Sequence, residues 1–162
     1  MELLLIRHAK AIDGELYAED GHRPLTADGR RHAQEVGAAL AEEGISLDAM
    51  VTSPFVRAVE TAELVACELG YEGALEVSAT LEPGGRPQEI MDRVIMPRSV
   101  KRLALVGHEP SMGNLLSALL QKPGLSMSKG AAVRLSWDGK RGKLVWVVKP
   151  KKLSPVGSLD GL

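Results

Sequence analysis

Cysteine and aromatic residues are scarce in this chain of 162 residues. The single cysteine, Cys67, excludes an internal disulfide and cannot build a cysteine-based metal cluster. With only two Trp, two Tyr and one Phe, a protein that stacks nucleic-acid bases on aromatic rings is not expected. The longest apolar run near the start, Leu3 to Ile6, is too short to span a bilayer and lacks the basic flank of a signal peptide. These absences favour a soluble, cytoplasmic protein that binds neither nucleic acid nor membrane.

The residues that are present fit one globular domain whose charge is unevenly distributed. Hydrophobic residues make up 44% of the chain and charged residues 25%, as in a protein that buries a sizeable core. Residues 1–97 carry 8 Lys and Arg against 18 Asp and Glu, whereas residues 98–162 carry 12 against 3. The basic C-terminal third is therefore a candidate docking surface for an acidic partner. The alternative, which we favour, is that both halves interleave in one sheet and leave most charges on a solvated face.

Apolar segments alternate with helical patterns along the chain, and this alternation predicts an α/β fold. Strands are expected at 2–6, 47–52, 75–77 and 102–106. Helices are expected from the N-cap Thr26 to Gly44, from Ser53-Pro54 to Gly70, over 88–95 and from Pro110 onward. A β-hairpin is expected from 131–137 and 143–148.

These elements predict a three-layer α/β sandwich with a mostly parallel central sheet and helices on both faces. The antiparallel C-terminal hairpin is expected at or near one edge of the sheet. The domain is expected to span residues 1–150. Residues 151–162 are rich in Pro, Gly, Ser and Lys and are expected to form a C-terminal tail that is loose or merely lies on the surface. The polar stretch from Ala9 to Pro24 predicts no regular element.

Arginine and histidine side chains follow three of the predicted strands. The first strand ends in Arg7-His8, the second leads into Ser53-Pro54 with Arg57 in the next helical turn, and the fourth ends in Gly107-His108. In open α/β sheets ligands bind outside the carboxyl ends of the strands, so these side chains are expected to meet there. Two guanidinium groups beside helix N-termini form a pocket suited to a compact dianion such as phosphate.

The histidines indicate what happens to that phosphate. A neutral imidazole attacks phosphorus effectively when an acceptor holds its other ring nitrogen. Arginines neutralise charge on the transferring group, so such a site needs no metal and no cofactor. Each residue alone has an ordinary structural interpretation, and it is the shared position at three strand ends that favours a catalytic site.

The same residues resemble the histidine phosphatase (phosphoglycerate mutase-like) superfamily. Leu5-Ile6-Arg7-His8-Ala9 is similar to its opening motif, and further blocks follow in the family's order: Arg23-Pro24-Leu25-Thr26, Gly29, Ser53-Pro54, Arg57-Ala58, Thr61-Ala62 and Val106-Gly107-His108. The resemblance covers roughly residues 3–120. It implies that His8 is the phosphorylated nucleophile and that Arg7, Arg57 and His108 complete the phosphate pocket. Ala9 replaces the glycine usual after the Arg-His pair, which narrows the conformations open to the turn.

Within this superfamily the sequence looks most like SixA-type phosphohistidine phosphatases, because the chain is small and its Arg-Pro-Leu-Thr block follows soon after the first motif. The substrate expected from this resemblance is phosphohistidine on a signalling or phosphotransfer protein, from which imidazole leaves without a dedicated acid. Glu82 lies in the loop where related esterases hold a general acid, so a phosphomonoesterase acting on a small metabolite is the second hypothesis. A non-catalytic phosphate-binding module is the third. No metal-ligand spacing is present.

Overall fold

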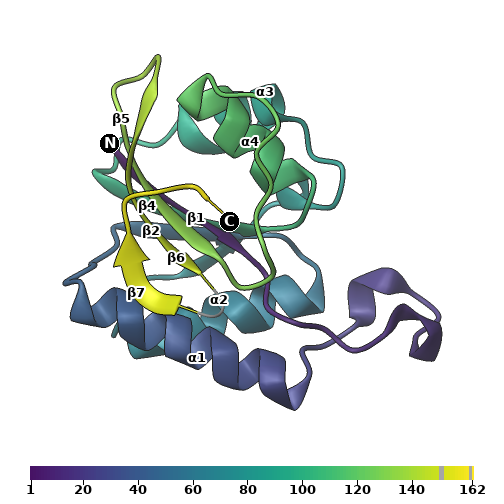
Figure 1. The fold of residues 1–162 in the computed structure, drawn as a ribbon. Coiled ribbons are helices and arrows are strands. Elements are labelled where there is room, and N and C mark those ends of the chain that lie inside the picture. The colour runs from purple at the N-terminus through teal and green to yellow at the C-terminus, as the bar shows by residue number, and fades with distance from the viewer. Residues whose placement is uncertain (150–151, 161) are drawn as a thin grey trace.

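The computed structural model describes residues 1–149, 152–160 and 162, and in this part of the chain seven strands form one mixed sheet (Figure 1). The strands are β1 (Glu2–Arg7), β2 (Ala49–Thr52), β3 (Leu75–Val77), β4 (Arg102–Gly107), β5 (Ala132–Trp137), β6 (Gly142–Lys149) and β7 (Lys152–Val156). Their order is β3-β2-β4-β1-β5-β6-β7. The first four in this order are parallel and the last three antiparallel. The predicted α/β class and the antiparallel C-terminal hairpin are therefore confirmed.

The central strands β1 and β4 are apolar on both faces because helices cover the sheet on both sides. They pair in parallel with Leu3 opposite Leu103 and Leu5 opposite Leu105. Since side chains alternate along a strand, Leu3 and Leu5 belong to one core cluster, and Leu4 and Ile6 belong to the other. This double burial fixes the register that brings Arg7 and Gly107 to the same edge of the sheet.

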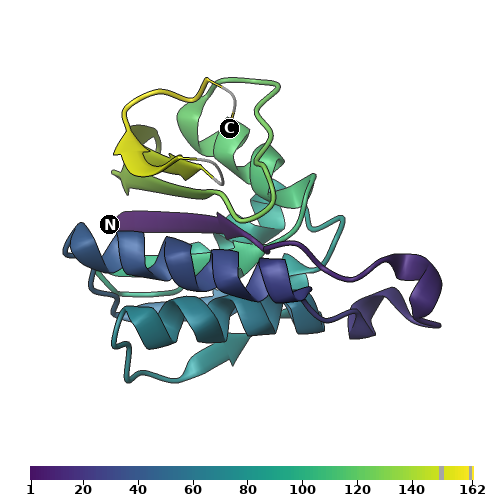
Figure 2. The ribbon, with the colours of Figure 1, turned by 60° about the horizontal axis from the view of Figure 1, so that its bottom comes forward.

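Four α-helices form the two outer layers (Figures 1 and 2). They are α1 (Ala27–Glu42), α2 (Val56–Glu68), α3 (Pro87–Ile90), which continues as a π-helical turn over Met91–Ile95, and α4 (Ser111–Leu120). Helices α1 and α2 pack on one face of the sheet, and α3 and α4 pack on the other. Thr26 caps α1 as predicted, since its Oγ1 accepts Gly29 N–H at 3.0 Å. No helix in the described part of the chain is long and apolar enough to cross a bilayer.

The predicted start of the second helix at Ser53-Pro54 is wrong by two residues. Helix α2 begins at Val56, and its N-cap is Phe55. Ser53 still accepts the N–H of Phe55 on its Oγ, at 3.3 Å, but this hydroxyl also bonds a histidine ring. The serine therefore forms a turn between strand and helix, and tertiary contact prevails over the local capping signal.

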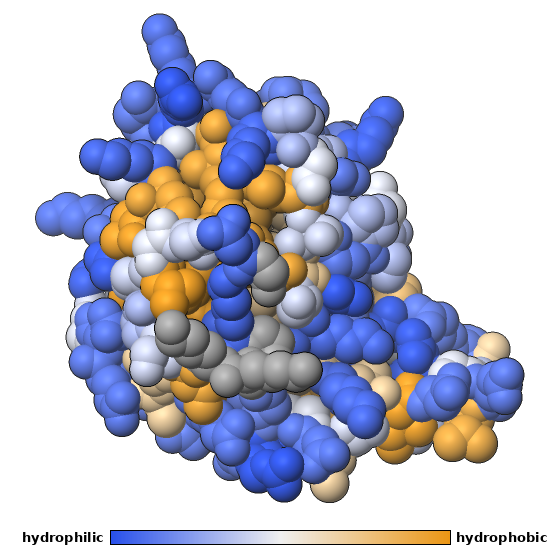
Figure 3. Space-filling model, viewed as in Figure 1, coloured by the Kyte–Doolittle hydropathy of each residue, from blue (hydrophilic) through white to orange (hydrophobic). Residues whose placement is uncertain are grey.

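The prediction of a loose C-terminal tail is wrong for residues 152–156, which form the edge strand β7 against β6. Four apolar side chains attach this segment: Leu153 packs on one core cluster, and Val156, Leu159 and Leu162 pack on the other. In the space-filling view, apolar surface gathers over the antiparallel strands and the C-terminal segment crosses part of it (Figure 3). Residues 150, 151 and 161 lie outside the described residues. The division into a domain over 1–150 and a tail over 151–162 stays a prediction.

The stretch for which no element was predicted forms an arm that projects from the body beyond the end of β1 (Figure 2). It contains two short 3-10 turns, Gly14–Leu16 and Asp20–His22. An isolated antiparallel bridge between Ala11 and Leu25 closes its base. Arg23 braces it from within by donating to Ile12 O at 3.0 Å. The arm thus leaves and re-enters the body at the edge where the predicted site residues lie.

Candidate active site

The structure brings the four predicted site residues Arg7, His8, Arg57 and His108 together at the carboxyl edge of the parallel strands. Arg7 ends β1 and His8 follows it, while His108 follows the last residue of β4. The centroids of the two histidine rings are 4.9 Å apart. Arg57, in the first turn of α2, is close enough that its charge lowers the pKa of both histidines.

His8 is held as a neutral imidazole with one free nitrogen. Its side chain is 7% exposed, and its Nδ1 lies 2.7 Å from the carbonyl oxygen of Ala9. Burial lowers the pKa of His8 to about 4, and the positive charges of Arg57 and Arg7 act in the same direction. At neutral pH the ring is therefore uncharged, with Nδ1–H donating to Ala9 and the lone pair on Nε2.

The alanine in the Arg-His-Ala motif fits the turn. Ala9 is fully buried, and its N–H donates to Thr61 Oγ1 at 3.1 Å. Thr61 in turn donates to the carbonyl of Arg57 at 2.7 Å. The bond between Ala9 and Thr61 ties the end of β1 to α2. Among the described residues, Gln121 is the only non-glycine with a positive φ, so Ala9 does not need the conformations that favour glycine.

His108 is buried more deeply than His8 and is attached to the turn before α2. Its side chain is 1% exposed, and its Nε2 lies 2.8 Å from Ser53 Oγ. The edge of the Phe55 ring packs against the imidazole, with centroids 5.1 Å apart. The pKa of His108 is lowered to about 3. Burial is the main cause, and positive charge on His8 and Arg57 acts in the same direction. Sequence reasoning recognised Ser53 only as a helix start and missed its contact with this ring.

Arg57 is clamped by a carboxylate that the sequence did not reveal. Its side chain is 4% exposed, and Nη1 and Nη2 donate to the carbonyl and to Oδ2 of Asp20 at 2.7 and 2.8 Å. The hydrogen bond from Arg57 is the main cause that lowers the pKa of Asp20. Asp20 lies in the arm, where its one signal was its position three residues before Arg23, which also pairs with it.

Three buried nitrogens of the site have no protein partner. Within the part of the chain that the structure describes, Arg7 Nε, Arg57 Nε and His108 Nδ1 make no hydrogen bond. Arg134 Nε, His32 Nε2 and Trp146 Nε1, which lie outside this site, are also unpaired among the described residues. What suits anionic oxygens here is therefore the gathering of two guanidinium groups with unpaired nitrogens at one edge of the sheet. No three His, Cys, Asp or Glu side chains of the described residues gather so that they could hold a metal ion.

The loop that carries Glu82 packs against the start of α4. Ser111 Oγ, three residues after His108, accepts Gly84 N–H at 3.1 Å and lies 3.5 Å from the carbonyl oxygen of Glu82. Gly85 N–H also donates to that carbonyl, at 3.0 Å. The half-buried Glu82 is thus attached through its backbone to the element that follows His108.

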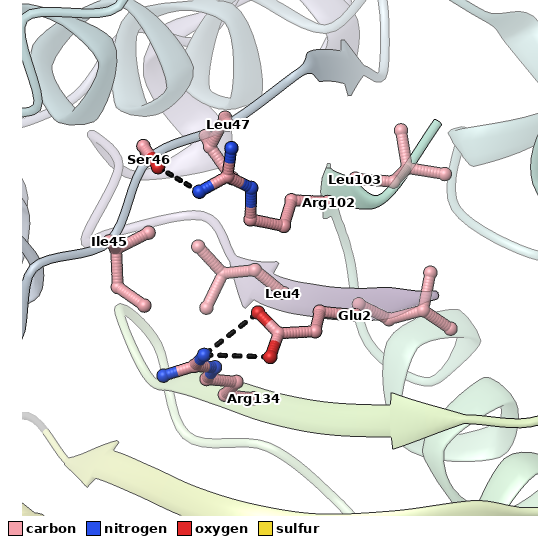
Figure 4. Close-up of a pocket in the computed structure, with 9 residues that line it drawn as sticks. Glu2, Leu4, Ile45, Ser46, Leu47, Arg102, Leu103 and Arg134 are labelled. Carbon is pink, nitrogen blue, oxygen red and sulfur yellow. Dashed lines mark hydrogen bonds and ion pairs between the residues drawn. The ribbon is translucent and has the colours of Figure 1, made fainter. Parts of the chain in front are cut away.

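A groove at the opposite edge of the sheet has a structural explanation (Figure 4). Arg134 donates to both carboxylate oxygens of Glu2 at 2.8 Å, and Arg102 bonds Ser46 and, at 3.2 Å, Asp48. These bonds join the amino ends of β1 and β4 to their neighbours. The charges of this groove are therefore paired with one another, far along the strands from His8.

The depressed pKa values of the two site histidines predict acid sensitivity of the fold. Their ordinary value is 6.5, against about 4 for His8 and about 3 for His108 in the folded state. Below pH 6.5 the unfolded chain therefore binds more protons than the native one, and the free energy of unfolding should decrease as pH falls from 6.5 to 5. Urea unfolding across this range measures the slope.

Histidine variants provide the control for this slope. His8→Asn and His108→Asn should each flatten it by about one proton's contribution. Equal slopes in the wild type and in both buried variants would contradict the assignment of neutral, buried imidazoles.

Comparisons with known proteins agree with this geometry. The family model for the histidine phosphatase superfamily (branch 1) matches residues 3–84. An uncharacterized protein of Picosynechococcus sp. (strain PCC 7002) is 33% identical over 96% of this chain and 100% of its own length. A phosphohistidine phosphatase SixA homolog of Haemophilus influenzae is 30% identical, over 90% of this chain and 93% of its own. The structure of the protein histidine phosphatase SixA complexed with tungstate aligns at a TM-score of 0.87 and 25% identity, covering 95% of this chain and 100% of that one.

Proposed function

This chain belongs to branch 1 of the histidine phosphatase superfamily, and we propose that it is a metal-independent phosphatase in which His8 accepts the phosphoryl group. The observation that carries the proposal is the neutral imidazole of His8 beside unpaired buried donors. Its Nδ1–H is occupied by Ala9 at 2.7 Å, so the Nε2 lone pair is the reactive one. Arg7 Nε, Arg57 Nε and His108 Nδ1 provide contacts for phosphate oxygens.

The reaction proceeds in two displacements at phosphorus. In the first, His8 Nε2 forms a bond to phosphorus while the bond to the leaving group breaks, and the leaving group departs with the bonding electrons and takes up a proton. Arg7, Arg57 and His108 hold the non-bridging oxygens, on which negative charge is concentrated. In the second, water attacks phosphorus, the N–P bond breaks, and inorganic phosphate leaves with the neutral imidazole restored.

Ser53 sets which nitrogen of His108 carries the ring proton. Its Oγ accepts Phe55 N–H and lies 2.8 Å from His108 Nε2, and we infer that the serine hydroxyl donates its hydrogen to this ring nitrogen. The remaining nitrogen, Nδ1, then carries the hydrogen of the neutral ring and donates it to a phosphate oxygen. A burial-lowered pKa near 3 keeps this imidazole uncharged at neutral pH, so it acts as a donor without adding a positive charge.

Phosphohistidine on a partner protein is the substrate that we favour. The relative from Haemophilus influenzae is named for this activity, and the aligned SixA structure is described as a protein histidine phosphatase. The chemistry agrees, since imidazole leaves readily once protonated and needs no dedicated acid on the enzyme. The partner is proposed to dock over the basic C-terminal third, at its end near the site.

Only part of that basic third lies near His8. Lys129 is exposed, and its charge contributes to lowering the pKa of His8. The cations of the β5–β6 turn, Lys140 and Arg141, lie at the opposite edge, because Ser136 pairs with Glu2 at the start of β1. An acidic surface around the phosphohistidine would therefore meet Lys129 first.

A paired assay in excess chelator tests the proposal. Phosphate release is measured from a histidine-phosphorylated protein and from a panel of sugar phosphates. We expect release from the phosphoprotein that is unaffected by chelator. Preference for one sugar phosphate would instead support the esterase hypothesis, and tight phosphate binding without turnover of any substrate would support a binding module.

The loop that carries Glu82 is attached next to the element that follows His108, so the esterase hypothesis can be tested at Glu82. Glu82→Gln removes the only acidic proton that this loop can give to an alkoxide leaving group. On phosphohistidine we expect kcat to stay within about twofold of the wild type, because imidazole needs no such acid. A loss of about 100-fold on phosphohistidine, the size typical for a missing general acid, would contradict this expectation. The same loss on a sugar phosphate that the enzyme hydrolyses would support the esterase hypothesis.

A further inference from the structure

Arg7 is connected to a carboxylate, as Arg57 is to Asp20. The connection to Arg7 runs through backbone hydrogen bonds, whereas Asp20 binds Arg57 directly. Glu109 directly follows His108, and its Oε1 accepts two backbone N–H groups, from Gly113 at 2.9 Å and from Met127 at 3.1 Å. The carbonyl of the same Met127 accepts Nη1 of Arg7 at 2.6 Å. Two hydrogen bonds on one residue's backbone therefore connect Glu109 with Arg7.

We propose that Glu109 is a positioning residue for Arg7, acting through the backbone of Met127. The proposal rests on the proposed function, because it takes Arg7 to be a ligand of the phosphoryl group. Within the described residues, the Arg7 side chain donates to one acceptor, the backbone carbonyl of Met127, and its Nε has no partner. Where that free Nε points thus depends on where the Met127 carbonyl is held.

The surroundings of Glu109 keep its carboxylate in one place. It lies at the amino end of α4, where the helix dipole favours a negative charge. A Cβ at position 113 would come within 2.8 Å of Glu109 Oε2, so the glycine there leaves the room that the carboxylate occupies. The Met127 side chain is buried at 1% exposure and anchors the same segment in the core. Glu109, α4 and the segment before β5 therefore form one fixed unit.

This geometry assigns Glu109 the role of an acceptor and not that of a proton donor. One oxygen accepts two backbone N–H groups, from Gly113 and from Met127, so the carboxylate serves here as an acceptor. Its negative charge also opposes the burial that lowers the pKa of Arg7. A glutamine at this position would keep an oxygen for Met127 and Gly113, whereas an alanine would keep none.

Three single variants test the proposal. Glu109→Ala should raise the dissociation constant for inorganic phosphate and lower kcat/KM on a histidine-phosphorylated protein, each by about 10-fold or more. Glu109→Gln should restore both to within about threefold of the wild type, because the acceptor is retained. Ser117→Ala is the matched control: it removes the acceptor of Leu125 N–H, at 3.0 Å, from the same segment without touching the path to Arg7. It should leave both quantities unchanged.

A double-mutant cycle shows whether Glu109 acts through Arg7. If it does, Glu109→Ala should cause no further loss of phosphate affinity in an Arg7→Ala background. Additive losses, equal effects of Glu109→Ala and Ser117→Ala, or failure of glutamine to restore binding would each overturn the proposal. Thermal unfolding of every variant identifies any that fail to fold. Phosphate binding is read at equilibrium, so it remains informative even if phosphohistidine proves not to be the substrate.

Discussion

Replacing His8 with asparagine should abolish turnover, by at least about a thousandfold, while the protein stays folded and still binds phosphate. In the proposed reaction His8 Nε2 is the only protein atom that forms a bond to phosphorus, and asparagine has no lone pair at that place. Its side-chain amide can still donate to Ala9 O, the acceptor that His8 Nδ1 uses at 2.7 Å. Arg7, Arg57 and His108 remain to bind the anion. Steady-state assays together with phosphate titration measure both halves of this expectation.

The choice of asparagine over alanine separates chemistry from packing. Because His8 is 7% exposed and packs 4.9 Å from the His108 ring, alanine would leave a cavity in the site. His22→Ala, on the exposed surface of the arm, is a control for the loss of a histidine as such. Residual activity in His8→Asn above about one tenth of the wild type would mean that another group attacks phosphorus.

Replacing Arg57 with lysine should lower kcat/KM by about 100-fold or more, although the charge is kept. Lysine cannot reproduce the fork in which Nη1 and Nη2 hold Asp20 while Nε stays available for a phosphate oxygen. Packing of the guanidinium over Phe55, 4.9 Å from the ring centroid, would be lost as well. Both losses act on the transition state, so kcat should fall together with phosphate affinity.

Asp20→Asn is the informative comparison for Arg57. It keeps an oxygen for Nη2 and the backbone carbonyl for Nη1, which lie at 2.8 and 2.7 Å in the wild type. It also removes a negative charge from a site that binds an anion. We therefore expect a loss of less than about tenfold, with phosphate affinity equal to or above that of the wild type. If Arg57→Lys and Asp20→Asn were equally impaired, the clamp and not the free Nε would be what matters.

The two arginines of the site follow one physical rule. A buried guanidinium is costly unless charge and hydrogen bonds compensate it, yet a phosphate site needs donors that remain free. Arg57 is anchored on Asp20 by both terminal nitrogens, and Arg7 is anchored on the Met127 carbonyl by Nη1. Among the described residues, neither Nε has a partner. The anchored fork pre-orients the free donor before the anion arrives.

The sheet and the edge that carries the candidate site were predictable because their signals are local in the sequence. Nearly continuous apolar runs at 2–6 and 102–106 can only be buried strands, and the polar residues directly after them must lie at the carboxyl edge. Arg7, His8, Arg57 and His108 were found in this way. The pattern requires no knowledge of distant contacts.

The parts that were missed depend on tertiary contacts. Asp20 lies in an irregular arm, and nothing in its neighbourhood indicates that it reaches Arg57, which is 37 positions away. Ser53 has the capping signal of a helix start, but His108 takes its hydroxyl. The C-terminal tail has a loop-like composition, yet Leu153 and Val156 provide enough apolar contact to form an edge strand. In each case one distant partner decided the local structure.

The most direct test of the account is to trap the phosphorylated enzyme. The wild type is mixed with a histidine-phosphorylated protein, quenched within milliseconds into alkali that preserves N–P bonds, and mapped by mass spectrometry. We expect one added phosphoryl group on the peptide that contains His8. This group should be absent from His8→Asn and should be lost from the wild type as phosphate is released. Turnover without any phosphorylated intermediate, or a phosphoryl group on another residue, would contradict it.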